Sequence, residues 1–282
     1  MTKLDDILQL YSTAEVSERP ELTPISVSFI CEKGYLNLTT VDLTDRELEL
    51  LRVLLGEPVK HYDRWQAFLC GKGEKPAVEG KIRFILGKVE LKNSEFSLIT
   101  WKNALKEIFM TEILAFFQLN ATEFVLVERV GPTSYESADF LGIAQSLDAE
   151  LNTKTTFFIG NTWPADLELA KVFSEEQAMF GQAMNKNMPV ITAAKSALDY
   201  FTYQSRKQSY LLKSYQELFL KDPQLKKIIQ ALYHAQGNTT LAAKKLYLHR
   251  NSLQYKLNRF TKESGLDVKK MDDLMFCYLL TL

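Results

Sequence analysis

Apolar and polar residues alternate with two different periods along this chain, and the change of period divides it into segments. Between residues 81 and 192, short apolar runs bounded by turn residues are interspersed with apolar residues at helical spacing. The predicted order is a strand at 81–91, a helix at 97–112, strands at 113–119 and 123–130, a helix at 137–152, a strand at 155–161, a helix at 166–184 and a short strand at 189–192. The βαββαβ order is typical of a ferredoxin-like α+β sandwich, an antiparallel-centred sheet with helices on one face.

The first 75 residues predict a smaller mixed α/β region, whose role the sequence does not give. Its spacings predict, in order, a helix at 2–11, a loop at 12–24, a hairpin of strands at 25–30 and 35–41, a helix ending near residue 55 and a helix at 61–70. Thr44 and Glu47 have the spacing of a capping box, which places the start of the helix that ends near residue 55. The glycines and lysines of residues 71–80 then indicate a boundary.

From residue 196 onward only helical spacings occur, which predicts an all-α region. Residues 196–220 predict one long helix with a broad apolar and aromatic stripe, made of Leu198, Phe201, Leu211, Leu212, Tyr215, Leu218 and Phe219. Two interpretations of the stripe stay open, packing within one core or a seam between two copies of the chain. We therefore expect a middle domain at 78–195, a linker or dimerisation helix at 196–220 and a C-terminal domain at 221–282.

Residues 237–264 predict two helices joined by a tight corner. Asn238 is suited to cap the first helix, and Ala242 and Ala243 are small enough to let a second helix cross closely. Residues 247–249 form the corner, and Gly265 is placed to end the second helix. The second helix has a buried stripe of Leu253, Leu257 and Phe260, and its other faces carry Arg250, Ser252, Gln254, Tyr255, Lys256 and Arg259. Such a helix suits the DNA major groove, although many paired helices serve only for packing.

Charge favours the DNA interpretation over simple packing. From residue 221 onward the chain has eleven basic and five acidic residues, a net charge of about +6, whereas the remainder has 23 basic and 30 acidic residues. A basic C-terminal segment is the electrostatic pattern expected of a DNA-binding domain. The near-neutral total therefore conceals an asymmetry between the two parts.

The same stretch resembles Fis-type helix-turn-helix segments and, more closely, the C-terminal domain of the PucR/CdaR class of bacterial transcriptional regulators. The residues that carry the resemblance are Gly237-Asn238, Ala242-Ala243, Leu246 and the run from His249 to Leu257. This chain departs from the family pattern in having Ser252 for threonine, Lys256 for arginine, and Gln254 where arginine is common. The resemblance covers about the last 60 residues and implies a cytoplasmic regulator with duplex DNA as its partner.

We expect DNA contacts from two groups of residues. Lys244, Lys245 and Lys262 are expected at phosphates, and Arg250, Ser252, Gln254 and Tyr255 are the best candidates for facing bases. The remaining candidates are His249, Asn251, Lys256 and Arg259. For His249 two interpretations stay open, because its ring could bond DNA or could cap the second helix. A homodimer is expected, and an effector of unknown chemistry stays open.

The middle region resembles the degenerate GGDEF-like domain of PucR/CdaR-type regulators. Asn120-Ala121-Thr122-Glu123-Phe124 occupies the turn where a nucleotide cyclase carries its signature. A cyclase needs paired carboxylates for two metal ions and glycines for the approach of the nucleotide, and here only Glu123 remains. We therefore predict a sensor or interaction domain without catalytic residues; a structural spacer, a residual cyclase and a protein-docking adaptor are the alternatives.

No further chemistry emerges from the sequence. His61, His234 and His249 lack metal-ligand spacing, and Cys31, Cys70 and Cys277 are widely separated, so we expect no metal site, no cofactor and reduced thiols. No apolar run approaches the roughly 20 residues that span a bilayer. The N-terminus lacks the pattern of a secretory signal, which agrees with the expected cytoplasmic location.

Overall fold

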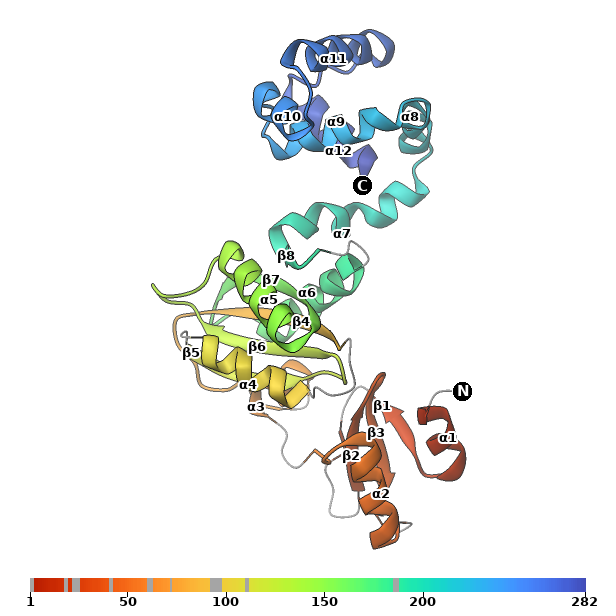
Figure 1. The fold of residues 1–282 in the computed structure, drawn as a ribbon, viewed down its shortest axis with the longest axis vertical. Coiled ribbons are helices and arrows are strands. Elements are labelled where there is room, and N and C mark those ends of the chain that lie inside the picture. Colours follow the sequence, from red (N-terminus) through yellow and green to blue (C-terminus); the bar gives the residue numbers. More distant parts are fainter. Residues whose placement is uncertain are drawn as a thin grey trace. The chain divides into compact units, whose positions relative to one another are not determined.

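The computed structural model of the protein describes residues 3–17, 20–21, 26–40, 43–59, 63–71, 73–91, 98–109, 112–184 and 188–282. The chain divides into two units, Met1–Ser196 and Ala197–Leu282. Figure 1 shows strands in the first unit and helices alone in the described residues of the second. The α+β class predicted from the sequence, with a helical C-terminal region, is therefore confirmed.

The larger sheet of the first unit has the predicted connectivity. Its spatial order is β5-β6-β4-β7-β8, and its strands are β4 (Lys81–Leu91), β5 (Glu112–Gln118), β6 (Glu123–Arg129), β7 (Thr153–Pro164) and β8 (Val190–Thr192). Neighbouring strands are antiparallel, except that β7 and β8 run parallel. Strands β4 to β7 therefore make up the βαββαβ unit, and β8 extends the sheet beyond it.

Helices cover both faces of this sheet. α4 (Leu98–Ile108) and α5 (Ser137–Leu151) pack on one face, as predicted for the helices of the βαββαβ unit, and Phe157 of β7 is buried against them. Successive strand residues point to opposite faces, so the next residue, Phe158, points away from that core. The Phe158 ring instead contacts α6 (Leu169–Ala183), which therefore covers the other face.

A three-stranded sheet forms the N-terminal part of the first unit. β2 (Ser26–Cys31) and β3 (Gly34–Thr39) form the predicted hairpin. β1 (Glu15–Ser17) pairs with the other edge of β3. The prediction of a continuous loop at 12–24 was therefore wrong at β1, because a strand of three residues is too short to show an alternating pattern.

The described residues of the first unit form three further helices before β4: α1 (Lys3–Leu10), α2 (Asp45–Leu55) and α3 (Arg64–Leu69), of which α3 packs against α6. The capping box of α2 is confirmed, since the Glu47 N–H donates to Thr44 Oγ1 at 3.3 Å and the Thr44 N–H donates to Glu47 Oε2 at 2.8 Å. α3 begins after its N-cap, Asp63, whose carboxylate accepts from the N–H groups of Trp65 and Gln66. The predicted start of α3 at residue 61 lies outside the described residues.

Hydrogen bonds join the small sheet to the turn between β5 and β6. The Tyr35 hydroxyl and Gln66 Nε2 both donate to the Gln118 carbonyl, at 2.6 and 3.0 Å. The Ala121 N–H donates to the Cys31 carbonyl at 3.0 Å. Burial raises the pKa of Tyr35 to about 12, so its hydroxyl remains a donor across the neutral range.

The helices of the C-terminal part are α7 (Ala193–Gln208), α8 (Tyr210–Lys221), α9 (Pro223–His234), α10 (Thr239–Lys245), α11 (Arg250–Ser264) and α12 (Met271–Thr281). α9 to α12 enclose an apolar core in which Ile229, Leu253 and Cys277 have no exposed surface. The two predicted helices joined by a corner are thus present in the second unit, and α9 packs against α10.

The prediction of one helix over 196–220 was wrong, because α7 and α8 are separate helices. The break lies at Ser209, whose backbone is extended (φ −74°, ψ 118°) and whose Oγ accepts from the Leu212 N–H at 3.2 Å. Serine commonly starts a helix in this way, because its hydroxyl satisfies a backbone N–H that lacks a helical partner. The apolar stripe is divided as well: Leu212 packs against the core of the second unit, whereas Leu211 is 56% exposed.

α6 carries a buried carboxyl group, Glu176, against the larger sheet. Glu176 is 2% exposed, and its Oε1 accepts from the Asn161 N–H at 2.8 Å and from Trp163 Nε1 at 3.0 Å. A Cβ on Gly160 would lie 2.1 Å from Glu176 Oε2, so the carboxyl group needs glycine beneath it. Burial raises the pKa of Glu176 to about 7, because the charged form is costly away from water.

We expect Glu176 to make the first unit less stable as the pH rises. Its pKa in the folded state is about 7, above the ordinary value of 4.5, so the native protein binds the proton more tightly than the unfolded chain. The resulting stabilisation is complete below about pH 4.5 and disappears as the pH rises through about 7. From the difference between the two pKa values, about 2.5, the stabilisation amounts to about 3 kcal/mol.

The prediction can be measured by urea denaturation of the protein and its Glu176→Gln variant between pH 5 and 8. Tryptophan fluorescence reports on the first unit alone, because Trp65, Trp101 and Trp163 all lie there. The substitution is expected to flatten the pH dependence of the unfolding free energy. Parallel pH profiles for the two proteins would show that Glu176 does not titrate in this range.

Candidate nucleic-acid interface

α10 is started and positioned by the residues that the sequence analysis singles out. Asn238 Oδ1 accepts from the Leu241 N–H at 3.0 Å, which confirms Asn238 as the N-cap. Ala242 and Ala243 are 0% and 3% exposed. Because each side chain is a single methyl group, the backbone of α10 can approach α11 closely.

The corner between α10 and α11 places an aromatic ring in solvent. Tyr247 has a positive φ of 54° and is 97% exposed, an unusual conformation for a residue with a side chain. The next residues lead into α11, where His249 Nδ1 accepts from the Asn251 N–H at 3.3 Å. Of the two roles left open for His249, the structure shows the cap; the imidazole is nevertheless exposed.

α11 has one apolar face and an outer face of polar and cationic residues. Leu253, Leu257 and Phe260 are 0%, 2% and 4% exposed, so the predicted buried stripe is confirmed. The helix ends at Gly265, which has the predicted left-handed conformation with φ 76°. Gln254 and Lys256 of α11 are half-buried, and its exposed residues are Arg250, Asn251, Ser252, Tyr255, Asn258, Arg259, Lys262 and Glu263.

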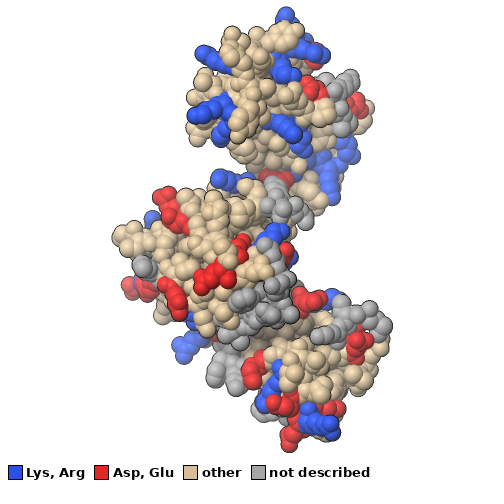
Figure 2. All heavy atoms as spheres, viewed as in Figure 1, with Lys and Arg blue, Asp and Glu red and all other residues tan. Residues whose placement is uncertain are grey.

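Lys244 and Lys245, the two cations of α10, are also exposed. In the view of Figure 2, Lys and Arg side chains outnumber Asp and Glu on the visible face of the second unit. Every residue proposed from the sequence for DNA contact therefore lies on α10, the corner or α11, and each is exposed or half-buried. Contact with DNA itself remains a prediction.

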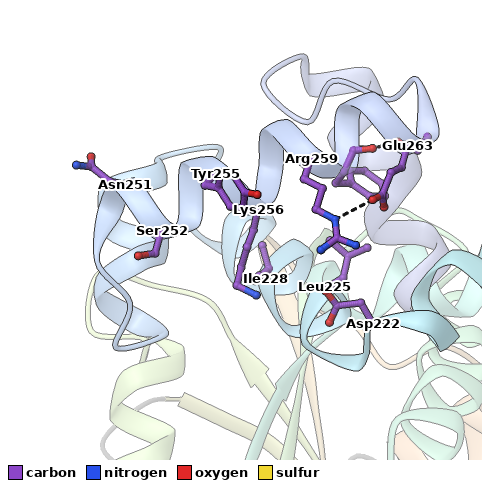
Figure 3. A pocket seen from close by; sticks show the side chains of 11 residues that line it. Asp222, Leu225, Ile228, Asn251, Ser252, Tyr255, Lys256, Arg259 and Glu263 are labelled. Carbon is purple, nitrogen blue, oxygen red and sulfur yellow. Dashed lines mark hydrogen bonds and ion pairs between the residues drawn. The ribbon is translucent and has the colours of Figure 1, made fainter.

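Several polar side chains of α11 are held by neighbours within the second unit. Gln254 Nε2 donates to Asn258 Oδ1 at 2.9 Å, and Lys256 Nζ donates to Gln224 Oε1 at 2.9 Å. Arg259 Nε donates to Glu263 Oε1 at 2.7 Å, as the dashed line in Figure 3 shows. Asn258 and Glu263 were not among the residues proposed from the sequence, although their spacing of four from Gln254 and Arg259 could have indicated both contacts.

A groove of about 810 Å³ runs between the start of α9 and α11. Leu225 and Ile228 of α9 and Phe260 of α11 supply its apolar lining, whereas Tyr255, Lys256, Arg259, Glu263 and Asp222 lie along it (Figure 3). Cations and acids thus occur side by side on this flank of α11. The groove can hold part of an extended polar molecule, but its mixed charges do not favour a simple anion.

The described residues include no group of three or more His, Cys, Asp or Glu side chains that could hold a metal ion. Burial raises the pKa of Cys277 to about 12 and also raises the pKa of Cys31, so both remain protonated thiols near neutral pH. Among the helices that the structure describes, none has the length and apolar character needed to cross a membrane.

Comparison with known proteins identifies the C-terminal segment. Residues 225–281 match the model of the PucR C-terminal helix-turn-helix domain, the segment that contains α10, the corner and α11. The predicted PucR-type helix-turn-helix is therefore confirmed over these residues. The predicted GGDEF-like character of the middle region stays a prediction.

Two relatives and one solved structure resemble larger parts of the chain. The Bacillus subtilis (strain 168) protein "Uncharacterized protein YxkF" is 24% identical over 300 residues, covering 99% of this chain and 98% of that protein. A "Leucine-rich protein" of Streptococcus dysgalactiae subsp. equisimilis is 30% identical over 144 residues, covering 50% of this chain and 51% of that protein. The crystal structure of a regulator of polyketide synthase expression from Bifidobacterium adolescentis aligns over 78% of this chain and 93% of that chain, with 12% identity and a TM-score of 0.34.

Proposed function

We propose that this protein is a transcriptional regulator that binds duplex DNA through α10 and α11. The observation that carries the proposal is the exposed cationic face of α11, which lies within the segment that matches a PucR helix-turn-helix. An exposed helix of 15 residues is about 22 Å long, enough to follow the floor of the major groove over several base pairs. We place this activity in the cytoplasm.

The exposed residues form two groups, according to the kind of DNA contact that we assign to them. Lys244, Lys245 and Lys262 are flexible cations, which suit phosphates and provide affinity for DNA of any sequence. Arg250 is the first residue of α11. The N-terminal residues of a recognition helix usually contact base edges. Ser252, Gln254 and Tyr255 follow it along the helix and complete the set that we assign to bases. The Asn251 N–H donates a hydrogen bond to His249 Nδ1 at the start of the helix. This contact positions both residues at the same end of the site.

We further propose that the regulator acts as a homodimer. Two copies of a helix-turn-helix read half-sites about one helical turn of DNA apart, which requires a second surface that joins them. Phe201 is 64%, Tyr210 85% and Leu211 56% exposed, and these apolar side chains of α7 and α8 are our candidates for that surface.

We assign no catalytic role to the middle region. The turn between β5 and β6 retains one acid, Glu123, whose Oε2 accepts from Asn120 Nδ2 at 3.0 Å. A two-metal site requires a second acid beside Glu123, and the Glu123 carboxylate already accepts a hydrogen bond from its neighbour. We propose a sensor or interaction role for this region, with an effector still to be identified.

Arg250→Ala is expected to weaken specific DNA binding by about 1–3 kcal/mol, because a bidentate base contact of this size would be lost. Genome-wide footprinting of the bound protein would first identify an operator, and fluorescence anisotropy on that duplex would give the affinities. Arg46→Ala is the matched control, since Arg46 is an exposed arginine of α2 in the other unit. Unchanged operator affinity in the Arg250 variant would contradict the assignment.

Lys244→Gln and Lys245→Gln are expected to weaken binding to operator and to unrelated duplex by similar factors. Each loss of a phosphate contact should reduce the slope of log affinity against log salt concentration by about 1. The same anisotropy titrations at several salt concentrations provide this slope. A loss confined to the operator would instead place these lysines at bases.

A further inference from the structure

Glu263 lies in the last turn of α11, among the residues that we assign to DNA. It is the single acidic residue of this fully described helix. Its carboxylate accepts from Arg259 Nε at 2.7 Å, and the two side chains are 58% and 69% exposed. A negative charge in the last turn opposes the helix dipole, which offsets the small stabilisation that an ion pair at this spacing gives the helix.

Arg259 is in an ion pair, unlike the other cations of α11. In the described part of the chain, Arg250, Lys256 and Lys262 are not in ion pairs, and the partner of Lys256 is the neutral amide of Gln224. Glu263 raises the pKa of Arg259, with smaller contributions from Tyr255 and Asp222. Arg259 therefore lies in a locally negative part of an otherwise cationic surface, beside the groove shown in Figure 3.

We propose that Glu263 is an internal counter-ion that competes with DNA phosphate for Arg259 and thereby limits the affinity of α11 for duplex DNA. This inference rests on the proposed function of α11. An exposed ion pair at a spacing of four residues is weak, so a phosphate can displace Glu263 from Arg259.

The competition has a consequence for counter-ion release. DNA binding is strengthened when a protein cation replaces a cation condensed on the phosphates, and each such exchange contributes about 0.9 to the salt slope. The ion pair of Arg259 and Glu263 has no net charge. While the pair persists, Arg259 therefore contributes little to counter-ion release. Removing the negative charge of Glu263 should restore the full contribution of Arg259.

Glu263→Gln preserves the shape of the side chain and tests the proposal. The variant is expected to bind duplex DNA of any sequence about two- to fivefold more tightly at 0.1 M salt, with a salt slope steeper by up to about 0.9. Fluorescence anisotropy with an operator duplex and an unrelated duplex measures both quantities. Circular dichroism of each variant confirms that the helices are intact.

Asp272→Asn is the matched control for net charge. Asp272 is an exposed acid at the start of α12, in the same unit but outside the lining of the groove. This control is expected to change the affinity less than twofold, because among the described residues Asp272 is paired with none of the cations assigned to DNA and salt screens the long-range effect of a surface charge. Equal effects of Glu263→Gln and Asp272→Asn would overturn the proposal, because net charge alone would then explain both.

A double variant tests whether Glu263 acts through Arg259. In an Arg259→Gln background, Glu263→Gln should no longer increase the affinity or the salt slope. A full increase in that background would overturn the proposed competition and indicate direct repulsion between Glu263 and DNA. If the unmodified protein binds neither duplex, the proposed function itself fails, which is distinct from a failure of this inference.

Discussion

The close contact between α10 and α11 is the interaction on which the candidate DNA interface depends. Ala242 and Ala243 leave room for the second helix. Leu253 and Leu257 of α11 occupy this space, and each is at most 2% exposed. Because burial of this apolar stripe determines how α11 is rotated, its opposite face is directed to solvent. The positions of the cations are thus set by apolar packing, and their charges act on a surface that is already in place.

Features that depend on a few neighbouring residues could be predicted from the sequence. Asn238 caps α10 and Gly265 ends α11 because the side-chain oxygen and the missing Cβ favour these positions in any protein. The short apolar runs of the middle region likewise predicted the order of the strands, since a run of this length between turn residues is typical of a buried strand. The outer face of α11 followed from the same reasoning, because it lies opposite Leu253, Leu257 and Phe260.

Features that depend on distant residues could not be predicted in this way. Helical spacing continues through Ser209, and only the structure shows that its hydroxyl caps α8. No residue near Glu176 in the sequence indicates that its carboxyl group is buried, because the Asn161 N–H and the Trp163 indole donate to it from β7. The contact of Lys256 with Gln224 spans 32 positions in the chain, so no local pattern could have revealed it.

The hydrogen bonds between the N-terminal sheet and the β5–β6 turn mean that the first 75 residues complete the middle region rather than merely precede it. If the chain began at residue 78, the Gln118 carbonyl would lose Tyr35 and Gln66, and the Ala121 N–H would lose the Cys31 carbonyl. Water would have to hydrate these groups, and the loss of Tyr35 would uncover apolar surface beside them. A boundary drawn from the composition of residues 71–80 therefore separates two segments of sequence that share one set of contacts in space.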